Sequence, residues 1–181
     1  MDDNSLEKLR YPIGKFSRPE QISKEQINSW IQELDSFPKK LAQLVTPLSD
    51  EQLETPYRPE GWTIRQVIHH ISDSHHHSYI RFKWALTENE PVIKPYDEKG
   101  WAELHDTKQA PIEMSLEHLR IVHFKLVYLL RGLKSEDLDR TFIHPDDRST
   151  TSLKENIGRY VWHGNHHYAH IEKACKSNNW I

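Results

Sequence analysis

Apolar residues recur at helical spacing in four long segments of the chain, which are separated by polar and proline-containing stretches. Three segments follow Ser23, Thr63 and Ser152, and another begins near Ser115. After Ser23, Thr63 and Ser152 a glutamine or glutamate stands three residues on, which is the pattern of a capping box at a helix start. Apolar positions three and four residues apart lie on one face of a helix. The pattern therefore predicts an all-α protein built as a four-helix bundle.

The stretches that interrupt this pattern predict bends and loops. Pro38 lies inside the first segment, where a proline removes one backbone donor, so we expect a kink or a break there. Residues 88–111 and 134–151 form two long loops, and long loops in compact domains are often functional. The pattern indicates a short strand only at residues 141–143. Residues 1–22, with two prolines and a glycine, predict an irregular N-terminal arm.

Length, charge and cysteine usage narrow the class of protein. The chain has 181 residues, a net charge of −3 and scattered lysines and arginines. That length predicts one domain, residues 1–181, and the charge argues against a nucleic-acid partner. No apolar run approaches the roughly 20 residues of a membrane span, and the acidic start is unlike a signal peptide. The single Cys175 can form no intrachain disulfide. We therefore expect a cytoplasmic protein without a membrane partner, in which Cys175 is a small buried apolar residue.

The candidate chemistry lies in a histidine cluster near the end of the chain. Of the thirteen histidines, four fall in the stretch Trp162–His170. They form two pairs with a spacing of four residues, His163 with His167 and His166 with His170. On a helix such residues share a face, with Cβ atoms roughly 5–6 Å apart. Two imidazoles at that spacing can bind one ion such as Zn²⁺.

Helical phase separates the two pairs. At about 100° per residue, the apolar stripe of the fourth segment centres near Gly164. His163 and His167 lie closer to that centre than His170, and His166 lies nearly opposite to it. The first pair is therefore predicted to face the bundle and the second to face outward. The alternative is that both pairs are incidental surface histidines.

A third ligand would have to come from the second or third segment. Periodicity does not single one out, because it places His75 and His123 most centrally and His70 to the side of its stripe. A histidine on an apolar face is most often a hydrogen-bonded core residue. The candidates are His69, His70, His75, His76 and His77 in the second segment, and His118 and His123 in the third.

Two stretches resemble the signatures of the DinB-like superfamily. Gly61–His70 resembles the start of its second helix, where a ligand histidine stands eight residues after a tryptophan. Trp162–Ile171 resembles its C-terminal signature, where the ligands are the first histidine and the one four residues later. Three further stretches, at 9–16, 93–98 and 142–145, are similar to the YfiT subgroup. The resemblance covers essentially the whole chain.

This resemblance implies a metal site and a class of activity. It implies that His70, His163 and His167 hold one divalent ion, Zn²⁺ or Ni²⁺, in a bundle with up-down-down-up connectivity that often forms a homodimer. His170 departs from the family, in which many members carry glutamine, and is expected near the site without being a ligand. The YfiT subgroup implies a metal-dependent hydrolase. Related members are thiol S-transferases that use bacillithiol, mycothiol or glutathione, so the expected partner is a small-molecule substrate such as a low-molecular-weight thiol.

Three neutral imidazoles suit catalysis because they leave a coordination position open, as in catalytic zinc sites. Such an ion lowers the pKa of a bound water to about 7 or favours the thiolate of a substrate thiol. Gly164 stands where a zincin motif has its glutamate. The general base is therefore not identified, and no catalytic role is assigned to Asp73 or Glu155.

Four residues of the two long loops, Tyr96, Asp97, Trp101 and His144, either shape a pocket over the metal or belong to ordinary loop packing. Two other functions stay open at this point. One is a non-catalytic metal-binding module of a stress response. The other is a structural bundle in which the histidines are incidental.

Overall fold

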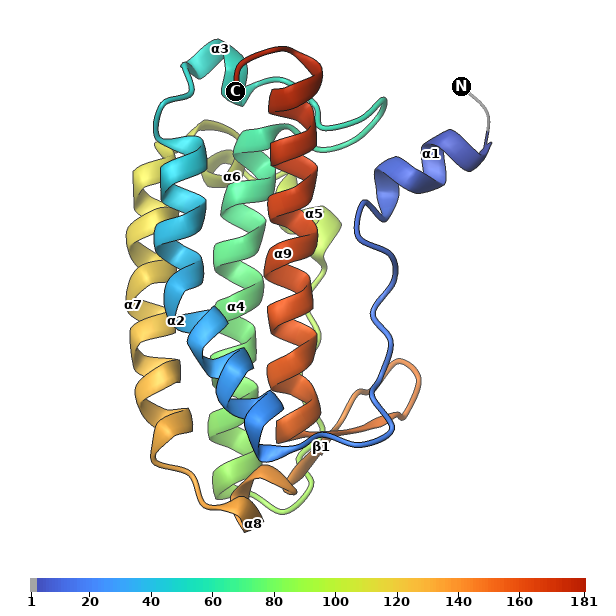
Figure 1. Cartoon of the computed structure of the whole chain (residues 1–181), viewed down its shortest axis with the longest axis vertical. Helices are drawn as coiled ribbons and strands as arrows, with labels where there is room; N and C mark the ends of the chain where they lie inside the picture. Colours follow the sequence, from blue (N-terminus) through green and yellow to red (C-terminus); the bar gives the residue numbers. More distant parts are fainter. Residues whose placement is uncertain (1–2) are drawn as a thin grey trace.

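Four long helices make up most of the structure, a computed structural model that describes residues 3–181. They lie side by side along the long axis of the molecule in Figure 1 and are α2 (Lys24–Val45), α4 (Ile64–Thr87), α7 (Ile112–Arg131) and α9 (Leu153–Ser177). Followed from blue to red, α2 and α9 run up the view, and α4 and α7 run down it. The predicted all-α bundle with up-down-down-up connectivity is confirmed.

The capping boxes predicted at the helix starts are only partly present in the structure. Thr63 accepts a hydrogen bond from the backbone N–H of Gln66, and the Gln66 side chain accepts one from the backbone N–H of Thr63. This is a complete capping box. Ser23 and Ser152 also accept from backbone N–H groups three residues on. Among the described residues, however, these two caps lack the return bond, so the capping box predicted at each of them is wrong in that detail.

The start of α7 also differs from the expected position near Ser115. The helix begins at Ile112, directly after Pro111, and no side chain of the described chain caps this end. Ile112 is buried in the core. Burial of this apolar residue therefore extends the helix beyond the polar residue at which the pattern placed its start.

Pro38 bends α2 without ending it. The helix is continuous from Lys24 to Val45, and its ribbon changes direction near the middle in Figure 1. Because proline has no N–H, the carbonyl of Leu34 loses its helical donor. The ring N–H at Nδ1 of His123 donates to that carbonyl instead, at 2.6 Å. A kink rather than a break is therefore the outcome of the prediction.

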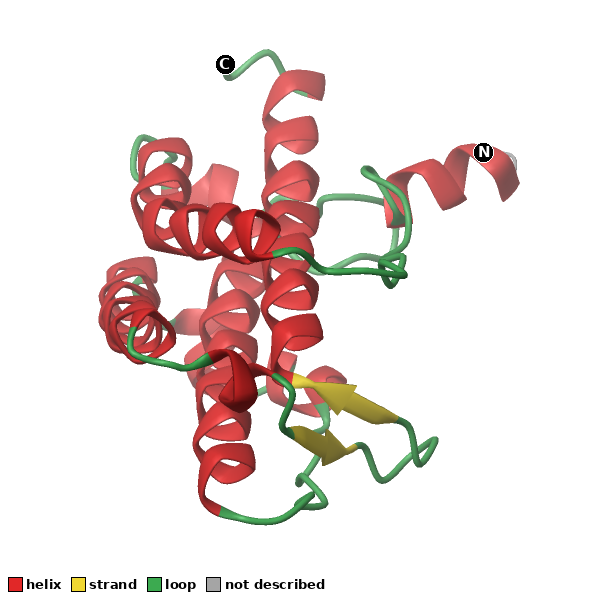
Figure 2. Cartoon of the chain, turned by 60° about the horizontal axis from the view of Figure 1, so that its bottom comes forward, coloured by secondary structure: helices red, strands yellow, loops and turns green. Residues whose placement is uncertain are grey.

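The segments that connect the long helices contain more regular structure than the sequence predicted. Short helices interrupt them, and the expected strand pairs with a second one in an antiparallel hairpin at one end of the bundle (Figure 2), with Phe142 opposite Thr151. These elements are α3 (Asp50–Leu53), α5 (Glu98–Ala102), α6 (His105–Gln109), α8 (Ser135–Leu138), β1 (Thr141–Ile143) and β2 (Thr150–Ser152).

The N-terminal arm is partly helical, so the prediction of an irregular arm over 1–22 is only partly correct. Its first part forms α1 (Asp3–Arg10), and residues 1–2 lie outside the described chain. The irregular remainder runs along α9, where Gly14 accepts a hydrogen bond from the Trp162 indole and Pro12 accepts one from Lys173.

The core consists of two apolar clusters, one toward each end of the bundle. On α4 the first cluster reaches Ile71 and the second includes Phe82, with His75 between them. Buried histidines stand at the same transition on α7 and α9. Cys175 lies buried in the first cluster, as predicted. The middle of the bundle is therefore polar, and this is where the candidate site lies.

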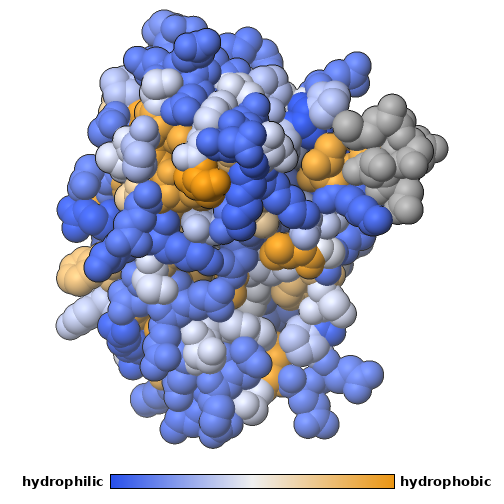
Figure 3. Space-filling model, turned by 45° about the horizontal axis from the view of Figure 1, so that its top comes forward, coloured by the Kyte–Doolittle hydropathy of each residue, from blue (hydrophilic) through white to orange (hydrophobic). Residues whose placement is uncertain are grey.

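The end of the molecule seen in Figure 3 is mostly hydrophilic, with separate hydrophobic patches. Within the described residues, every helix is too short or too polar to cross a membrane.

Candidate metal centre

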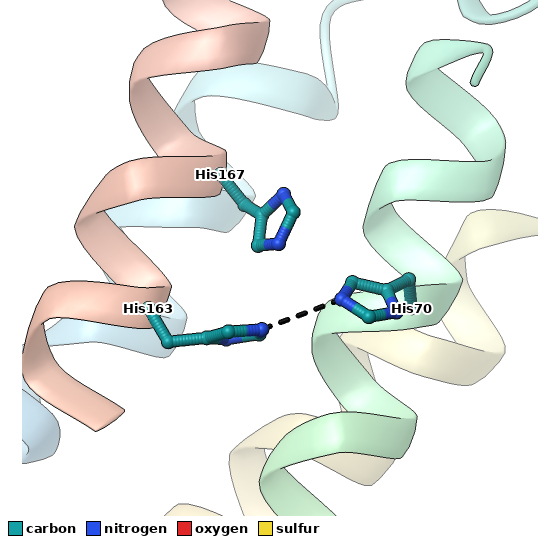
Figure 4. Close-up of side chains that lie close together, drawn as sticks. All are labelled: His70, His163 and His167. Carbon is teal, nitrogen blue, oxygen red and sulfur yellow. Dashed lines mark hydrogen bonds between the residues drawn. The ribbon is translucent and has the colours of Figure 1, made fainter. Parts of the chain in front are cut away.

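Three histidines from two facing helices converge at mid-height of the bundle. His70 extends from α4, and His163 and His167 extend from one face of α9 (Figure 4). Each offers a ring nitrogen, and these three atoms all lie within 4.8 Å of one another. The Nε2 atoms of His70 and His163 are 3.3 Å apart. The structure thus brings together the three residues that the family resemblance implied as ligands.

A second group, formed by His166, His167 and His170, has ligand atoms within the same range. The expectation that His166 and His170 face outward is wrong, because they are 7% and 3% exposed. The N-terminal arm covers this side of α9. Tyr11 lies against the His166 ring at 5.8 Å between centroids, and the carbonyl of Arg10 accepts a hydrogen bond from His170 Nε2 at 3.0 Å.

Burial keeps the three converging rings neutral. It lowers the pKa of His70 to about 4. It also lowers the pKa of His163 and of His167 well below 6.5, and the neighbouring histidines act in the same direction. A neutral imidazole has one free lone pair, which is the form that binds a metal ion. The donor set therefore fits a divalent ion that accepts nitrogen ligands, such as Zn²⁺ or Ni²⁺.

Each of these rings has a partner at its other nitrogen. The Nδ1 of His163 lies 3.2 Å from His75 Nε2, and the Nδ1 of His167 lies 3.4 Å from His170 Nδ1. The Nδ1 of His70 lies 3.4 Å from the Tyr96 hydroxyl. Such partners orient metal-binding histidines in proteins. Sequence reasoning did not assign this role to His75 or His170, although helical phase placed His75 centrally.

The remaining histidine candidates are engaged away from the three rings. His69 Nδ1 lies 2.6 Å from the Ser115 hydroxyl. His76 Nδ1 lies 3.0 Å from His118 Nε2, and the His77 ring stacks on Tyr96 at 4.3 Å. The structure therefore gives none of these four histidines to the converging group.

A cavity of about 470 Å³ opens beside the site, with His163 in its wall. Three of the four loop residues expected near a pocket line it, whereas Trp101 instead packs against Tyr96 at 4.9 Å. Three larger hollows among the described residues, of about 530, 680 and 720 Å³, have no histidine in their lining. The lining of the first cavity is Ser74, Arg81, Pro95, Tyr96, Asp97, Glu98, Lys99, His144, Asp146, Tyr160 and His163.

Polar groups in the cavity wall are available for a ligand. Arg81 Nη1 donates to the Tyr160 hydroxyl at 3.3 Å, while its buried Nε has no hydrogen-bond partner among the described residues. The two acidic residues weighed as bases do not line the cavity. Burial, aided by Asp106, raises the pKa of Asp73 to about 6, and the buried Glu155 pairs with arginines.

The comparison with known proteins gives the family. Residues 33–171 match the model of the DinB superfamily, and the chain therefore belongs to that superfamily. A protein of Bacillus cereus strain AH820 is 52% identical over 172 residues, which cover 95% of this chain and 98% of that protein. A protein of Bacillus thuringiensis subsp. konkukian is 51% identical over the same length and the same shares of the two chains. Both relatives carry the name "putative metal-dependent hydrolase".

A solved structure confirms the fold and the YfiT subgroup. YfiT from Bacillus subtilis superposes with a TM-score of 0.95 at 49% sequence identity, over 96% of this chain and 99% of that one. That protein is described as a "probable metal-dependent hydrolase with an unusual four-helix bundle topology". The up-down-down-up order of the helices here agrees with that likeness.

Proposed function

We propose that this protein is a metal-dependent enzyme of the hydrolase type, in which His70, His163 and His167 hold one divalent ion, Zn²⁺ or Ni²⁺. The observation that carries the proposal is that three neutral imidazoles converge and that one of them, His163, lies in the wall of a cavity. Three protein ligands leave a position for a reactant, whereas structural zinc is normally closed by four. The names of the relatives support the same class of activity.

A bound divalent ion would supply Lewis acidity, which makes water or a thiol a better nucleophile at neutral pH. The chain itself supplies the surroundings. Ser74 Oγ lies 3.3 Å from His163 Nε2, so its hydroxyl can orient a reactant there. Burial raises the pKa of Tyr96, so this phenol stays protonated and can donate a hydrogen bond. A cavity of about 470 Å³ is within the size range of small-molecule sites.

Arg81 gives the cavity a group for binding the substrate. Its side chain lies in the cavity wall, and its positively charged guanidinium favours a ligand that brings an acceptor. A carboxylate or another acidic group on the substrate would meet that need with a charge-assisted hydrogen bond. The expected substrate is therefore a small molecule with an anionic or strongly accepting group.

The first experiment measures metal content in protein purified without an affinity tag. Wild type should contain about one ion per chain. Alanine at His70, His163 or His167 should remove most of it, because two imidazoles bind a divalent ion far more weakly than three. His166→Ala is the matched control, since His166 belongs only to the second histidine group. Loss of metal in that variant together with retention in His70→Ala would overturn the proposed ligand set.

The second experiment identifies the reaction. Metal-loaded protein is tested on p-nitrophenyl esters and anilides, and on monochlorobimane with and without bacillithiol, mycothiol or glutathione. Metal-dependent hydrolysis that weakens in Arg81→Gln would support the proposal. Conjugation that depends on an added thiol, without hydrolysis, would make the protein a thiol S-transferase. Tight metal binding without turnover would indicate the non-catalytic module, and absence of stoichiometric metal would leave the histidines without a ligand role.

A further inference from the structure

A chain of imidazoles leads from the candidate site across the whole bundle. His163 on α9 contacts His75 on α4, with 3.2 Å between Nδ1 and Nε2. His75 in turn contacts His123 on α7, with 2.8 Å between Nδ1 and Nε2. The chain ends at the carbonyl of Leu34 on α2, 2.6 Å from His123 Nδ1. We call His75 and His123 the inner relay, because together they link all four long helices.

The last contact determines the direction of every other hydrogen bond in this chain. A carbonyl oxygen only accepts, so the proton of His123 is on Nδ1, and its Nε2 accepts from His75. The proton of His75 is then also on Nδ1, and its Nε2 accepts from His163. His163 therefore carries its proton on Nδ1, and its free lone pair is on Nε2. This is the nitrogen that lies 3.3 Å from His70 Nε2.

The two rings of the inner relay are buried in their neutral form. His75 and His123 are 0% and 1% exposed. Removing a charged imidazole this completely from water is costly, so both rings are neutral. Each ring therefore has one N–H and one lone pair, so a donor at one nitrogen means an acceptor at the other.

Pro38 explains why the Leu34 carbonyl is available. In an uninterrupted helix, the backbone N–H four residues on would donate to this oxygen. Pro38 occupies that position inside α2 and has no N–H to give. The proline thus leaves a buried acceptor with no helical donor, and His123 on the neighbouring helix satisfies it.

His167, the second proposed ligand on α9, is oriented by a shorter chain of hydrogen bonds of the same kind. His170 Nε2 lies 3.0 Å from the Arg10 carbonyl, so its proton is on Nε2 and its Nδ1 accepts. The atom 3.4 Å from that Nδ1 is His167 Nδ1, which is therefore a donor and leaves the lone pair on Nε2. The ring of Tyr57 stacks on His170 at 4.1 Å and holds it in place.

We propose that the inner relay and His170 are positioning residues, which fix His163 and His167 in the one tautomer whose Nε2 lone pair is free for the ion. The Leu34 and Arg10 carbonyls are the fixed ends of the two arrangements. Within the part of the chain that the structure describes, His70 has no such anchor, because the Tyr96 hydroxyl can donate as well as accept. This inference depends on the proposed ligand set for its purpose, although the tautomers themselves do not require a metal.

The same hydrogen bonds discriminate between the two histidine groups. His170 donates from Nε2 to Arg10 and accepts at Nδ1 from His167. Both of its nitrogens are then engaged, and it has no lone pair for an ion. His167 likewise has only its Nε2 lone pair free. The proposal therefore assigns the ion to the group that contains His70 and not to the one that contains His166.

The direct test reads the tautomers by NMR. Long-range proton–nitrogen correlation spectra of ¹⁵N-labelled, metal-free protein distinguish Nδ1–H from Nε2–H in each ring. We expect Nδ1–H at His163, His167, His75 and His123, and Nε2–H at His170. An Nε2–H tautomer at His163, or a rapidly exchanging mixture there, would overturn the proposal. This readout succeeds or fails independently of whether the protein is an enzyme.

The second test measures zinc affinity by competition with a chromophoric chelator. Loss of an orienting partner typically weakens metal binding about 10- to 100-fold, so we expect that loss in His75→Phe and His170→Leu. His170→Gln should stay close to wild type, because an amide can accept from His167 and donate to Arg10. His76→Phe, one residue along α4, is the control for His75→Phe, since His76 contacts His118 and not the relay.

The outcomes of the two tests separate this inference from the proposed function. Wild-type affinity in folded His75→Phe and His170→Leu would overturn the positioning roles and leave the ligand set intact. Failure of wild type to bind zinc would overturn the ligand set, whatever the tautomers are. If His75→Phe does not fold, the comparison of His170→Leu with His170→Gln decides, because equal affinity in those two variants would contradict the proposal.

Discussion

The buried His123 should make folding of the metal-free protein sensitive to mild acid. Burial lowers its pKa from 6.5 to about 4, against the smaller opposing effects of the Leu34 carbonyl and Asp35. Between these two pH values the unfolded chain binds a proton at this residue and the folded chain does not. The free energy of unfolding therefore falls as the pH falls, starting near 6.5 and ending near 4. At about 1.4 kcal/mol per pH unit, this one residue accounts for a loss of about 3 kcal/mol.

Urea denaturation of wild type and His123→Phe, followed by circular dichroism in the presence of a chelator, measures this effect. The phenylalanine retains a ring between Phe37 and His75, which stack on His123 at 5.8 and 4.9 Å. The variant loses the hydrogen bonds at every pH, so only the change with pH is compared. Between about pH 7.5 and about pH 5, wild type should lose about 2 kcal/mol more than His123→Phe.

An equal loss of stability in the two proteins would contradict this prediction, because it would mean that His123 takes up its proton as easily in the folded state as in the unfolded one. Tyr79→Phe serves as the control, because it changes an aromatic side chain on α4 without removing an imidazole. It should keep the pH dependence of wild type. A smaller change of the free energy of unfolding with pH in the control would show that altering any aromatic side chain, and not the loss of His123, produces the effect.

Three further predictions concern packing, capping and assembly. Gly158→Ala should lower the stability by about 1–3 kcal/mol in thermal denaturation, because a Cβ there would lie 2.6 Å from the Trp30 ring; an unchanged melting temperature would contradict this. Thr63→Ala should cost about 1 kcal/mol through loss of the α4 cap, and Thr63→Ser should recover most of it. The homodimer implied by the family resemblance is expected to use the outer face of α7, where Phe124 is 66% exposed. Phe124→Glu should then convert a dimer to a monomer in light scattering, and a monomeric wild type would contradict the expectation.

Much of the fold follows from local signals in the sequence. Helical periodicity and the Ser23, Thr63 and Ser152 caps locate three helix starts, because both depend on residues close together in the chain. The start of α7 was missed, since burial of Ile112 depends on the packing of distant residues. The short helices in the two long loops have four or five residues each, too few to give a periodic signal.

The candidate site was less accessible to sequence reasoning. Helical phase alone favoured His163 over His166, since ligands on one helix share a face. His70 came only from the family resemblance, because its place opposite α9 depends on how two distant helices pack. The outward orientation predicted for His166 and His170 failed for a similar reason: the N-terminal arm that covers them is remote in the chain.

The polar layer between the two apolar clusters also bears on how the four helices align. Apolar side chains within one cluster can exchange partners at modest cost, so apolar packing alone tolerates a shift of one helix along another. A shift by one turn, about 5.4 Å, would separate His163 from His75 and His123 from Leu34, whose contacts are short. Each buried polar group left unpaired costs about 1–3 kcal/mol. The buried histidine contacts therefore fix how the four helices align. A slipped bundle that the two apolar clusters would tolerate would leave these polar groups unpaired.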